Sequence, residues 1–228
     1  MDITLHYIEE GTGPPLLLLH GNGEDGTYFK HQLAYFSKKY RVIAVDTRGH
    51  GQSPRGAAPF TISQFAEDLN AFLEQRDISK AVILGFSDGA NIAMRFAMKH
   101  PEKVEALILN GGNLNARGVK ASVQIPIELG YRMTKLFSRI SEKARKNHEM
   151  LALMVDDPNI EPSELKEIHV PTLVIAGTED MIKEEHTKLL AAEIPGAELK
   201  FVKGGHFVAA KASEEFNAAV DLFLERVL

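Results

Sequence analysis

The sequence predicts an α/β fold, a doubly wound and mostly parallel sheet of about seven strands with helices on both faces and a small helical cap. Short apolar runs recur along the chain, and segments of helical periodicity lie between them. Several runs are continuous rather than alternating, Leu16–Leu19 most plainly. Continuous apolar runs are typical of strands covered on both faces, as in parallel sheets, whose crossovers are right-handed.

The predicted strands come in chain order and are all short. The segment Ile3–Ile8 alternates more than the others, which indicates an edge strand. The six remaining strands are expected at Pro15–His20, Arg41–Asp46, Ala81–Ser87, Ala106–Asn110, Thr172–Gly177 and Leu199–Val202.

The predicted helices lie between these strands. Thr61–Gln75 places Phe65, Leu69, Phe72 and Leu73 on one face, and Thr61 has the residue type of an N-cap. Further helices are expected over Asn91–Lys99, Met181–Ile194 and Ala212–Val227.

One long segment, Asn113–Ile168, interrupts the alternation of strand and helix. It contains helical signals, no good strand run and a dense group of charges at Arg139–Lys146. The charges favour the solvated faces of two or three amphipathic helices. The segment is too long for a loop in a compact domain. We therefore predict a single domain, residues 1–228, with an inserted helical cap at about 113–168.

Composition excludes several classes of protein. The 228 residues are 44% apolar, which suits one sizeable core. Lys and Arg total 26 against 31 Asp and Glu, a net charge of -5 that argues against nucleic-acid binding. No cysteine is present, so disulfides, thiolate metal sites and a cysteine nucleophile are excluded.

The apolar runs are too short to cross a bilayer, and Met1–Leu5 has neither the basic nor the apolar region of a signal peptide. We expect a soluble, cytoplasmic protein with no membrane partner. The oligomeric state stays open.

Gly85-Phe86-Ser87-Asp88-Gly89 is a G-x-S-x-G pattern. Alone it is weak, but here it ends an apolar strand and opens a helix, the setting of a nucleophile elbow. Small residues at both ends let the backbone approach closely at a sharp turn. The pattern predicts that Ser87 projects at the carboxyl end of the sheet, where ligands bind in such folds.

A serine hydroxyl needs a base to take its proton. Among nine histidines, His206 follows two glycines after the last strand run, whereas His169 precedes a strand and His186 falls within a helix. We therefore expect His206 to be the base.

The base needs an acid to orient it, and Asp180 directly follows the strand Thr172–Gly177, with Glu179 as its rival. The chain order is then Ser, Asp, His, as in nucleophile-elbow hydrolases.

An oxyanion hole is predicted from the loop His20-Gly21-Asn22-Gly23, which follows the first buried strand. The backbone N–H of Asn22, rather than its side chain, and the backbone N–H of Asp88 are the expected donors. Losing one such donor in a comparable site costs on the order of 100- to 1000-fold in rate.

These features together resemble the α/β-hydrolase superfamily over essentially the whole chain. Asp46–Ser53 is similar to its D-x-R-G-x-G-x-S segment, and Ile168–Gly177 to its I-x-x-P-t-L-v-i-x-G run before the acid. The resemblance implies a mainly structural role for the first segment, so Arg48 and His50 stand outside the predicted catalytic set. The family's usual first strand is missing here, which is why a reduced sheet is expected.

Asp88 departs from the family pattern, and two interpretations stay open. Its charge could stabilise the N-terminus of the following helix. Alternatively, it pairs with a cationic group of the substrate, because Gly85–Gly89 is similar to the elbow of some amino-acid-ester hydrolases. Asn22, Asp88 and Phe207 are the predicted substrate-binding residues, together with the cap.

The leading functional prediction is cleavage of a small carboxylic ester, thioester or lactone through an acyl-enzyme on Ser87, without cofactor or metal. A second hypothesis is C–C bond hydrolysis or a cofactor-free lyase reaction on the same triad. A third is a non-catalytic ligand-binding protein on a hydrolase scaffold. Because His206 must be neutral to act as a base, activity is expected to rise with pH through the imidazole range.

Overall fold

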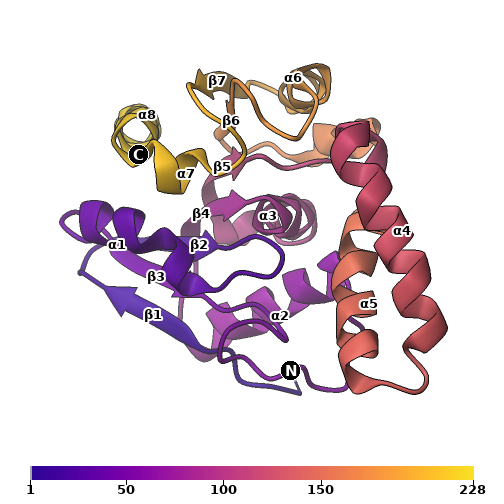
Figure 1. Ribbon diagram of the computed structural model, residues 1–228. Coiled ribbons are helices and arrows are strands. Elements are labelled where there is room, and N and C mark those ends of the chain that lie inside the picture. The colour runs from indigo at the N-terminus through magenta and orange to yellow at the C-terminus, as the bar shows by residue number, and fades with distance from the viewer. Residues whose placement is uncertain (1) are drawn as a thin grey trace.

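A computed structural model describes residues 2–228 and confirms the predicted fold class. A seven-stranded sheet has the order β1-β3-β2-β4-β5-β6-β7, and only β1 pairs antiparallel to its neighbour (Figure 1). The strands are β1 (Tyr7–Glu10), β2 (Pro15–Leu19), β3 (Arg41–Val45), β4 (Ala81–Phe86), β5 (Val104–Asn110), β6 (Thr172–Gly177) and β7 (Glu198–Val202).

Helices cover both faces of the sheet. One face carries α1, α7 and α8, and the other carries α2, α3 and α6 (Figure 1). The α-helices are α1 (Lys30–Phe36), α2 (Ile62–Gln75), α3 (Asp88–Lys99), α4 (Ala121–Phe137), α5 (Glu142–Val155), α6 (Glu184–Glu193), α7 (Val208–Lys211) and α8 (Ser213–Val227). The 3₁₀ turns are η1 (Gly26–Phe29), η2 (Pro101–Lys103), η3 (Ala116–Gly118) and η4 (Pro162–Glu167).

The leucine run of β2 explains why this sheet has two covered faces. Leu17 and Leu19 belong to the core under α2 and α3, whereas Leu16 and Leu18 belong to the core under α1 and α8. All four side chains are at most 1% exposed. Because successive residues of a strand point to opposite faces, a continuous apolar run fills two cores at once.

The helix α2 begins as its sequence predicts. Thr61 has an extended backbone, and its hydroxyl accepts a hydrogen bond from the Gln64 N–H at 3.2 Å. Phe65, Leu69 and Phe72 lie on the buried face. The Thr61 N-cap sets where α2 begins, and its buried face packs the helix against the sheet beside α3.

The predicted edge strand Ile3–Ile8 is wrong in its first half, since β1 spans only Tyr7–Glu10. The His6 N–H donates to the Ser53 hydroxyl at 2.8 Å instead of to a strand. Leu5 is buried in the core at 4% exposure. Its apolar side chain therefore reflects packing against the core and not membership of a strand.

The N-terminal segment is also fixed through Arg48, which follows β3. Arg48 is fully buried, and its guanidinium donates to Asp68 through Nε and Nη2, both at 2.7 Å. Its Nη2 also reaches the carboxylate of Asp2 at 2.6 Å. This arrangement agrees with the structural role that the family resemblance implied.

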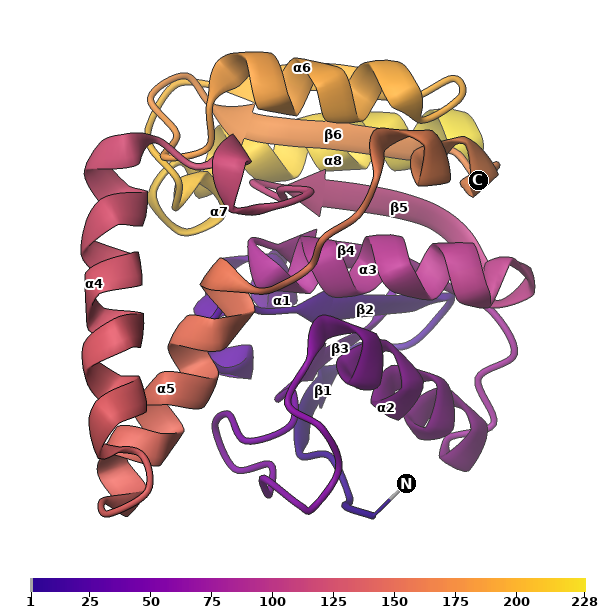
Figure 2. The ribbon, with the colours of Figure 1, turned by 90° about the vertical axis from the view of Figure 1, so that its right-hand side faces the viewer.

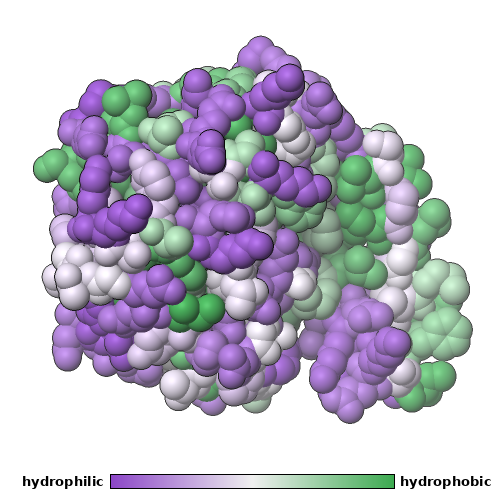
Figure 3. All heavy atoms as spheres, turned by 60° about the vertical axis from the view of Figure 1, so that its left-hand side comes forward, coloured by the Kyte–Doolittle hydropathy of each residue, from purple (hydrophilic) through white to green (hydrophobic). Residues whose placement is uncertain are grey.

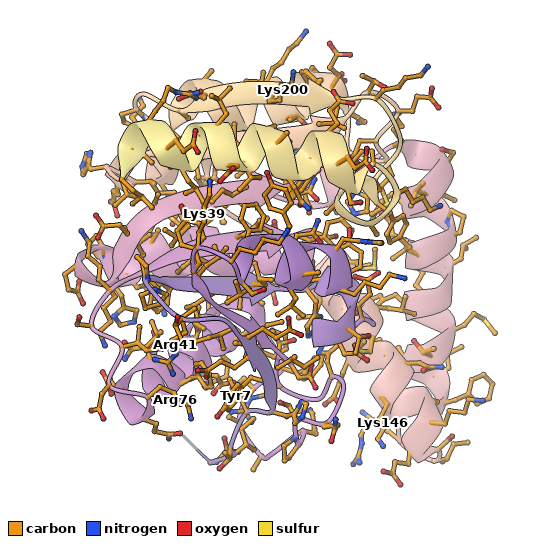
Figure 4. The ribbon with its side chains drawn as sticks, turned by 90° about the vertical axis from the view of Figure 1, so that its left-hand side faces the viewer. Tyr7, Lys39, Arg41, Arg76, Lys146 and Lys200 are labelled. Atoms are coloured by element: carbon orange, nitrogen blue, oxygen red, sulfur yellow. The ribbon has the colours of Figure 1, made fainter. Side chains whose placement is uncertain are left out.

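Ion pairs and a cation–π contact hold β1 at the edge of the sheet. Glu9 accepts from Arg41 Nε and from Arg76 Nη2, each at 2.8 Å, and the Arg76 guanidinium lies 4.5 Å from the centre of the Tyr7 ring. Figure 4 shows Tyr7, Arg41 and Arg76 gathered on this side of the molecule. Charges along an edge strand oppose pairing with another chain.

The segment 113–168 contains η3, α4, α5 and η4. The helices α4 and α5 lie side by side and extend beyond the carboxyl end of the sheet, with α5 nearer the body (Figures 1 and 2). We call these two helices and their connecting turn, residues 121–155, the cap. Among residues 2–228 no helix is both long and apolar enough to span a membrane.

Candidate active site

The turn between β4 and α3 holds Ser87 in an unusual backbone conformation. Its φ is 54° and its ψ is -119°, a region that non-glycine residues rarely adopt. The Ser87 N–H donates to the Asn110 carbonyl on β5 at 2.8 Å. Such strain persists only where the surroundings enforce it, and it is typical of functional sites.

Two glycines make this turn possible. A Cβ on Gly85 would lie 2.2 Å from the Gly89 carbonyl oxygen, and a Cβ on Gly89 would lie 1.9 Å from the Leu19 carbonyl oxygen. Real Cβ atoms do not approach so closely. The first residues of α3 therefore pack directly against β2 and β4, and the serine is held at the turn between them.

Ser87, His206 and Asp180 come together at the carboxyl end of the sheet. His206 Nε2 lies 3.0 Å from Ser87 Oγ, and His206 Nδ1 lies 2.7 Å from Asp180 Oδ1. Both distances are within hydrogen-bond range. His206 and Asp180 are buried, at 7% and 3% exposure, so their contact is shielded from water.

The Asp180 carboxylate is stabilised in its charged form. Burial raises its pKa, but the hydrogen bond and charge of His206 and the Ile182 and Gly177 N–H groups outweigh burial, so its pKa is lowered overall. Asp180 Oδ1 accepts from Ile182 at 2.9 Å and Oδ2 from Gly177 at 3.4 Å. A fixed acceptor of this kind holds an imidazole in one orientation.

The rival residues lie elsewhere. His169 is exposed and precedes β6, at the opposite end of the sheet from Asp180. His186 on α6 accepts a hydrogen bond from the Leu114 N–H at 2.9 Å, which gives it a structural contact. Glu179 is exposed. None of the three hydrogen-bonds to the Ser87 hydroxyl, whose partner among residues 2–228 is His206.

The predicted oxyanion donors flank the serine. The Asp88 N–H stands at the first position of α3, where a helix offers it no acceptor. No acceptor for the Asn22 N–H occurs among the hydrogen bonds of residues 2–228. The Asn22 side chain instead donates to the Met150 carbonyl of α5 at 2.7 Å. The side chain of Asn22 thus joins this loop to the cap.

Comparison with known proteins identifies the fold family. The family model of the alpha/beta hydrolase fold matches residues 14–126, which include β2 to β5 and the Ser87 turn. The chain belongs to the α/β-hydrolase fold superfamily.

Three similar proteins illustrate the range within this superfamily. An uncharacterized protein of Mycobacterium tuberculosis is 36% identical over 52% of this chain, a match that spans only 34% of that longer protein. A 3-oxoadipate enol-lactonase of Acinetobacter baylyi is 25% identical over 99% of this chain and 94% of its own length. A solved structure of Est816, described as an N-acyl homoserine lactone degrading enzyme, has a TM-score of 0.80 and 27% identity, covering 97% of both chains.

Asp88 is buried in this α/β-hydrolase, at 7% exposure. Its Oδ1 accepts from Asn91 Nδ2 at 3.3 Å, whereas Oδ2 has no hydrogen-bond partner among the described residues. Burial, followed by the nearby Asp157 charge, raises the pKa of Asp88 to about 7, although the Asn91 and Asn22 amides act in the opposite direction. Near neutral pH this carboxyl group is therefore poised between its two protonation states.

Sequence reasoning missed a second acidic group near His206. Glu24, just after the Asn22 loop, and the Tyr28 hydroxyl each have a buried oxygen without a partner among residues 2–228. Burial raises the pKa of Glu24 to about 7, while the nearby His206 charge opposes that rise. Burial, aided by the Glu24 and Asp180 charges, raises the pKa of Tyr28. Its place directly after the predicted oxyanion loop was the only hint in the sequence, and it does not show that the side chain is buried.

Three further residues, none with a polar side chain, lie against the His206 ring. Gly111 follows β5 with a φ of 63°, and a Cβ there would lie 2.8 Å from His206 Cε1. The Phe86 ring lies 4.8 Å from the His206 ring and 5.6 Å from the Phe207 ring, between centroids. Phe207, predicted to bind substrate, is 41% exposed beside the histidine. A glycine directly after a strand was the signal for Gly111.

Proposed function

We propose that this chain hydrolyses a small carboxylic ester or lactone through an acyl-enzyme on Ser87. The observation that carries the proposal is the continuous chain of contacts from Asp180 through His206 to the Ser87 hydroxyl. This arrangement of nucleophile, base and orienting acid is the one that activates a serine for acyl transfer.

The proposed reaction has two halves. His206 takes the Ser87 proton as the hydroxyl oxygen attacks the substrate carbonyl, and the Asn22 and Asp88 N–H groups stabilise the developing oxyanion. His206 then protonates the departing alcohol. A water molecule, activated by the same imidazole, attacks the acyl-enzyme and releases the acid. In a lactone the alcohol and the acid are parts of one product.

The names of two relatives make a lactone the first substrate to test. One is an enol-lactonase and the other is described as degrading N-acyl homoserine lactones. Both names refer to lactones, which are intramolecular esters. Esters and thioesters of similar size remain within the same acyl-transfer chemistry.

A substrate panel tests the proposal. Purified protein and its Ser87→Ala variant are incubated with γ-lactones, p-nitrophenyl esters and thioesters, and with a vinylogous C–C substrate. We expect hydrolysis of lactones or esters by the wild type and none above background by the variant. If only the C–C substrate is turned over, the protein is a C–C bond hydrolase and the ester or lactone proposal is wrong.

A fluorophosphonate probe provides the second measurement. It labels only an activated serine, so wild-type protein is expected to gain one adduct on Ser87. Folded protein that neither labels nor turns over any substrate would instead support a ligand-binding role.

We further propose that Asp88 binds a cationic group of the substrate. Its support is the buried Oδ2 of the residue next to the nucleophile, which has no hydrogen-bond partner among the described residues. Asp88→Asn is expected to remove a preference for amino-acid esters over neutral esters of the same size. If Asp88→Asn changes kcat/KM equally for both ester types, the role of Asp88 is to stabilise the N-terminus of α3 rather than to bind a cation.

A further inference from the structure

The outer face of the cap exposes apolar side chains that the proposed chemistry does not use. We define the α4 stripe as Ile125, Leu129, Met133, Leu136 and Ile140, which are 56%, 58%, 56%, 72% and 81% exposed. The first three follow at intervals of four residues, so they line one side of the helix. Figure 3 shows hydrophobic surface gathered over this part of the molecule.

The stripe is not needed to hold α4 in place. The other side of α4 packs on α5, where the Tyr131 hydroxyl donates to Asp156 at 2.7 Å and the Tyr131 ring stacks on His148 at 4.5 Å. Gln124 is buried on that side. An apolar helix face that packs on nothing is a sign of an interaction site.

A groove at the free end of the cap continues the stripe. It has a volume of about 430 Å³ and lies between the end of α4 and the start of α5. Met133, Phe137, Ile140 and Lys143 are among its lining residues. An apolar hollow with one cationic side chain at its rim can receive an alkyl chain next to an anionic group.

Charge around the stripe has the opposite sign to that of the whole chain. Arg132, Lys135 and Arg139 occur on α4 and the following turn, and no acidic side chain among residues 2–228 forms an ion pair with them. Residues 121–149 hold six basic and three acidic side chains, although the chain has a net charge of -5. Lys146 projects from the same end of the cap (Figure 4).

We propose that the α4 stripe docks on an anionic lipid surface. A helix with an apolar face and flanking basic residues lies in the membrane interface, with its apolar side chains among the acyl chains and its cations at the headgroups. Arg and Lys stems extend along apolar surface while their charges stay in water. This is a contact with the lipid surface only, and it departs from the expectation of no membrane partner; no helix among residues 2–228 is both long and apolar enough to span a membrane.

Charge argues against a second copy of this chain as the occupant. A two-fold contact between two α4 helices would bring each stripe and its flanks against their counterparts, and those flanks carry Arg132, Lys135 and Arg139 but only one acid, Glu128. Like charges facing one another oppose association. An anionic lipid surface attracts the same residues.

Vesicle sedimentation tests the proposal on the full chain. One set of vesicles is phosphatidylcholine alone, and the other contains about one third phosphatidylglycerol. We expect at least tenfold stronger partitioning onto the anionic vesicles, and a decline with added salt because the attraction is screened. Equal partitioning onto both sets would overturn the proposal.

Three variants separate the contributions. Leu136→Ser with Ile140→Ser is expected to lower partitioning about tenfold, and Arg132→Gln with Lys135→Gln and Arg139→Gln to remove the preference for anionic vesicles. The matched control is Leu222→Ser on α8, where the side chain is 59% exposed, and it should bind like the wild type. An equal loss of binding in this control, or no loss in the stripe variant, would reject a lipid contact. So would a wild-type dimer that dissociates when Leu136 and Ile140 are replaced by serine.

Discussion

Asp180 accepts hydrogen bonds from His206, Ile182 and Gly177, so its charge is fixed and its contact with the histidine is directional. Asp180→Asn keeps the shape but places an amide against His206 Nδ1, which favours the wrong tautomer. We expect kcat to fall by roughly 10⁴-fold with little change in folding. The fall in kcat is measured as ester or lactone hydrolysis at pH 8. The matched control is Glu179→Gln, an exposed neighbour that should retain full activity.

The buried carboxyl of Asp88 makes a prediction about stability. Its folded pKa of about 7 lies above the ordinary value of 3.8, so its contribution to stability is full below pH 3.8 and is lost as the pH rises to about 7. Asp88→Asn removes this loss. We expect the variant to be more stable than the wild type at pH 8, by about 2 kcal/mol, and to gain little at pH 4.

Urea unfolding at the two pH values measures this difference. An Asn91→Ala variant, which removes the hydrogen bond to Asp88 but leaves its charge, provides the contrast and should show no such gain at pH 8. An identical effect of Asp88→Asn at both pH values would contradict the assignment of a raised pKa.

Glu24 predicts a feature of the pH–rate profile. Below about pH 7 its carboxyl is protonated, and above that pH it is an anion near His206. Glu24→Gln removes this titrating group, so we expect the part of the kcat/KM profile near pH 7 that depends on it to change. Asp25→Asn, at the next and more open position, is the control, and an unchanged profile for Glu24→Gln would show that its carboxyl does not influence the reaction.

At this scale the sequence located the residues that follow a strand. Ser87, Asp180 and His206 each stand just after a predicted strand, and parallel strands bring their carboxyl ends to one edge. Glu24 was missed because nothing local distinguishes a buried acid from an exposed one. Its environment depends on Tyr28 and Phe86, which stack at 4.5 Å only after the chain has folded.

The close approach of α3 to β2 is the most demanding contact between elements. Gly89→Ala would place a methyl group against the Leu19 carbonyl, and neither backbone can move without disturbing the sheet. We expect a loss of roughly 3 kcal/mol in the free energy of unfolding. Gly205→Ala is the matched control, because its nearest neighbour is the Glu179 carbonyl oxygen at 3.8 Å, and denaturant melts should show near-native stability for it.

Elements with strong patterns were predictable, and those fixed by tertiary contacts were not. β6 has the predicted bounds, Thr172–Gly177, because its apolar run is flanked by clear breaks. α1 was not predicted at all, since its seven residues contain few periodic apolar positions. Its Gln32 is held by the Ala209 carbonyl and Asn217, which lie more than 170 residues away in the chain. No local pattern records such a contact.

Across the whole molecule, the buried Arg48 joins the loop after β3, the helix α2 and the N-terminal segment. Arg48→Met would leave Asp68 charged and buried without a cationic partner, and we expect a loss of about 3 kcal/mol. Arg48→Met with Asp68→Leu removes both charges and should recover most of that loss, as measured by denaturant unfolding. A double variant no better than the single one would show that packing, rather than charge, sets the cost.

The hydrogen bond from Asn22 to the Met150 carbonyl joins the loop of the proposed oxyanion donor to the cap helix α5. Coupling through such a contact is reciprocal, so a ligand that orders the cap through it would order the loop by the same free energy. We expect Asn22→Ala to remove this link between the loop and the cap.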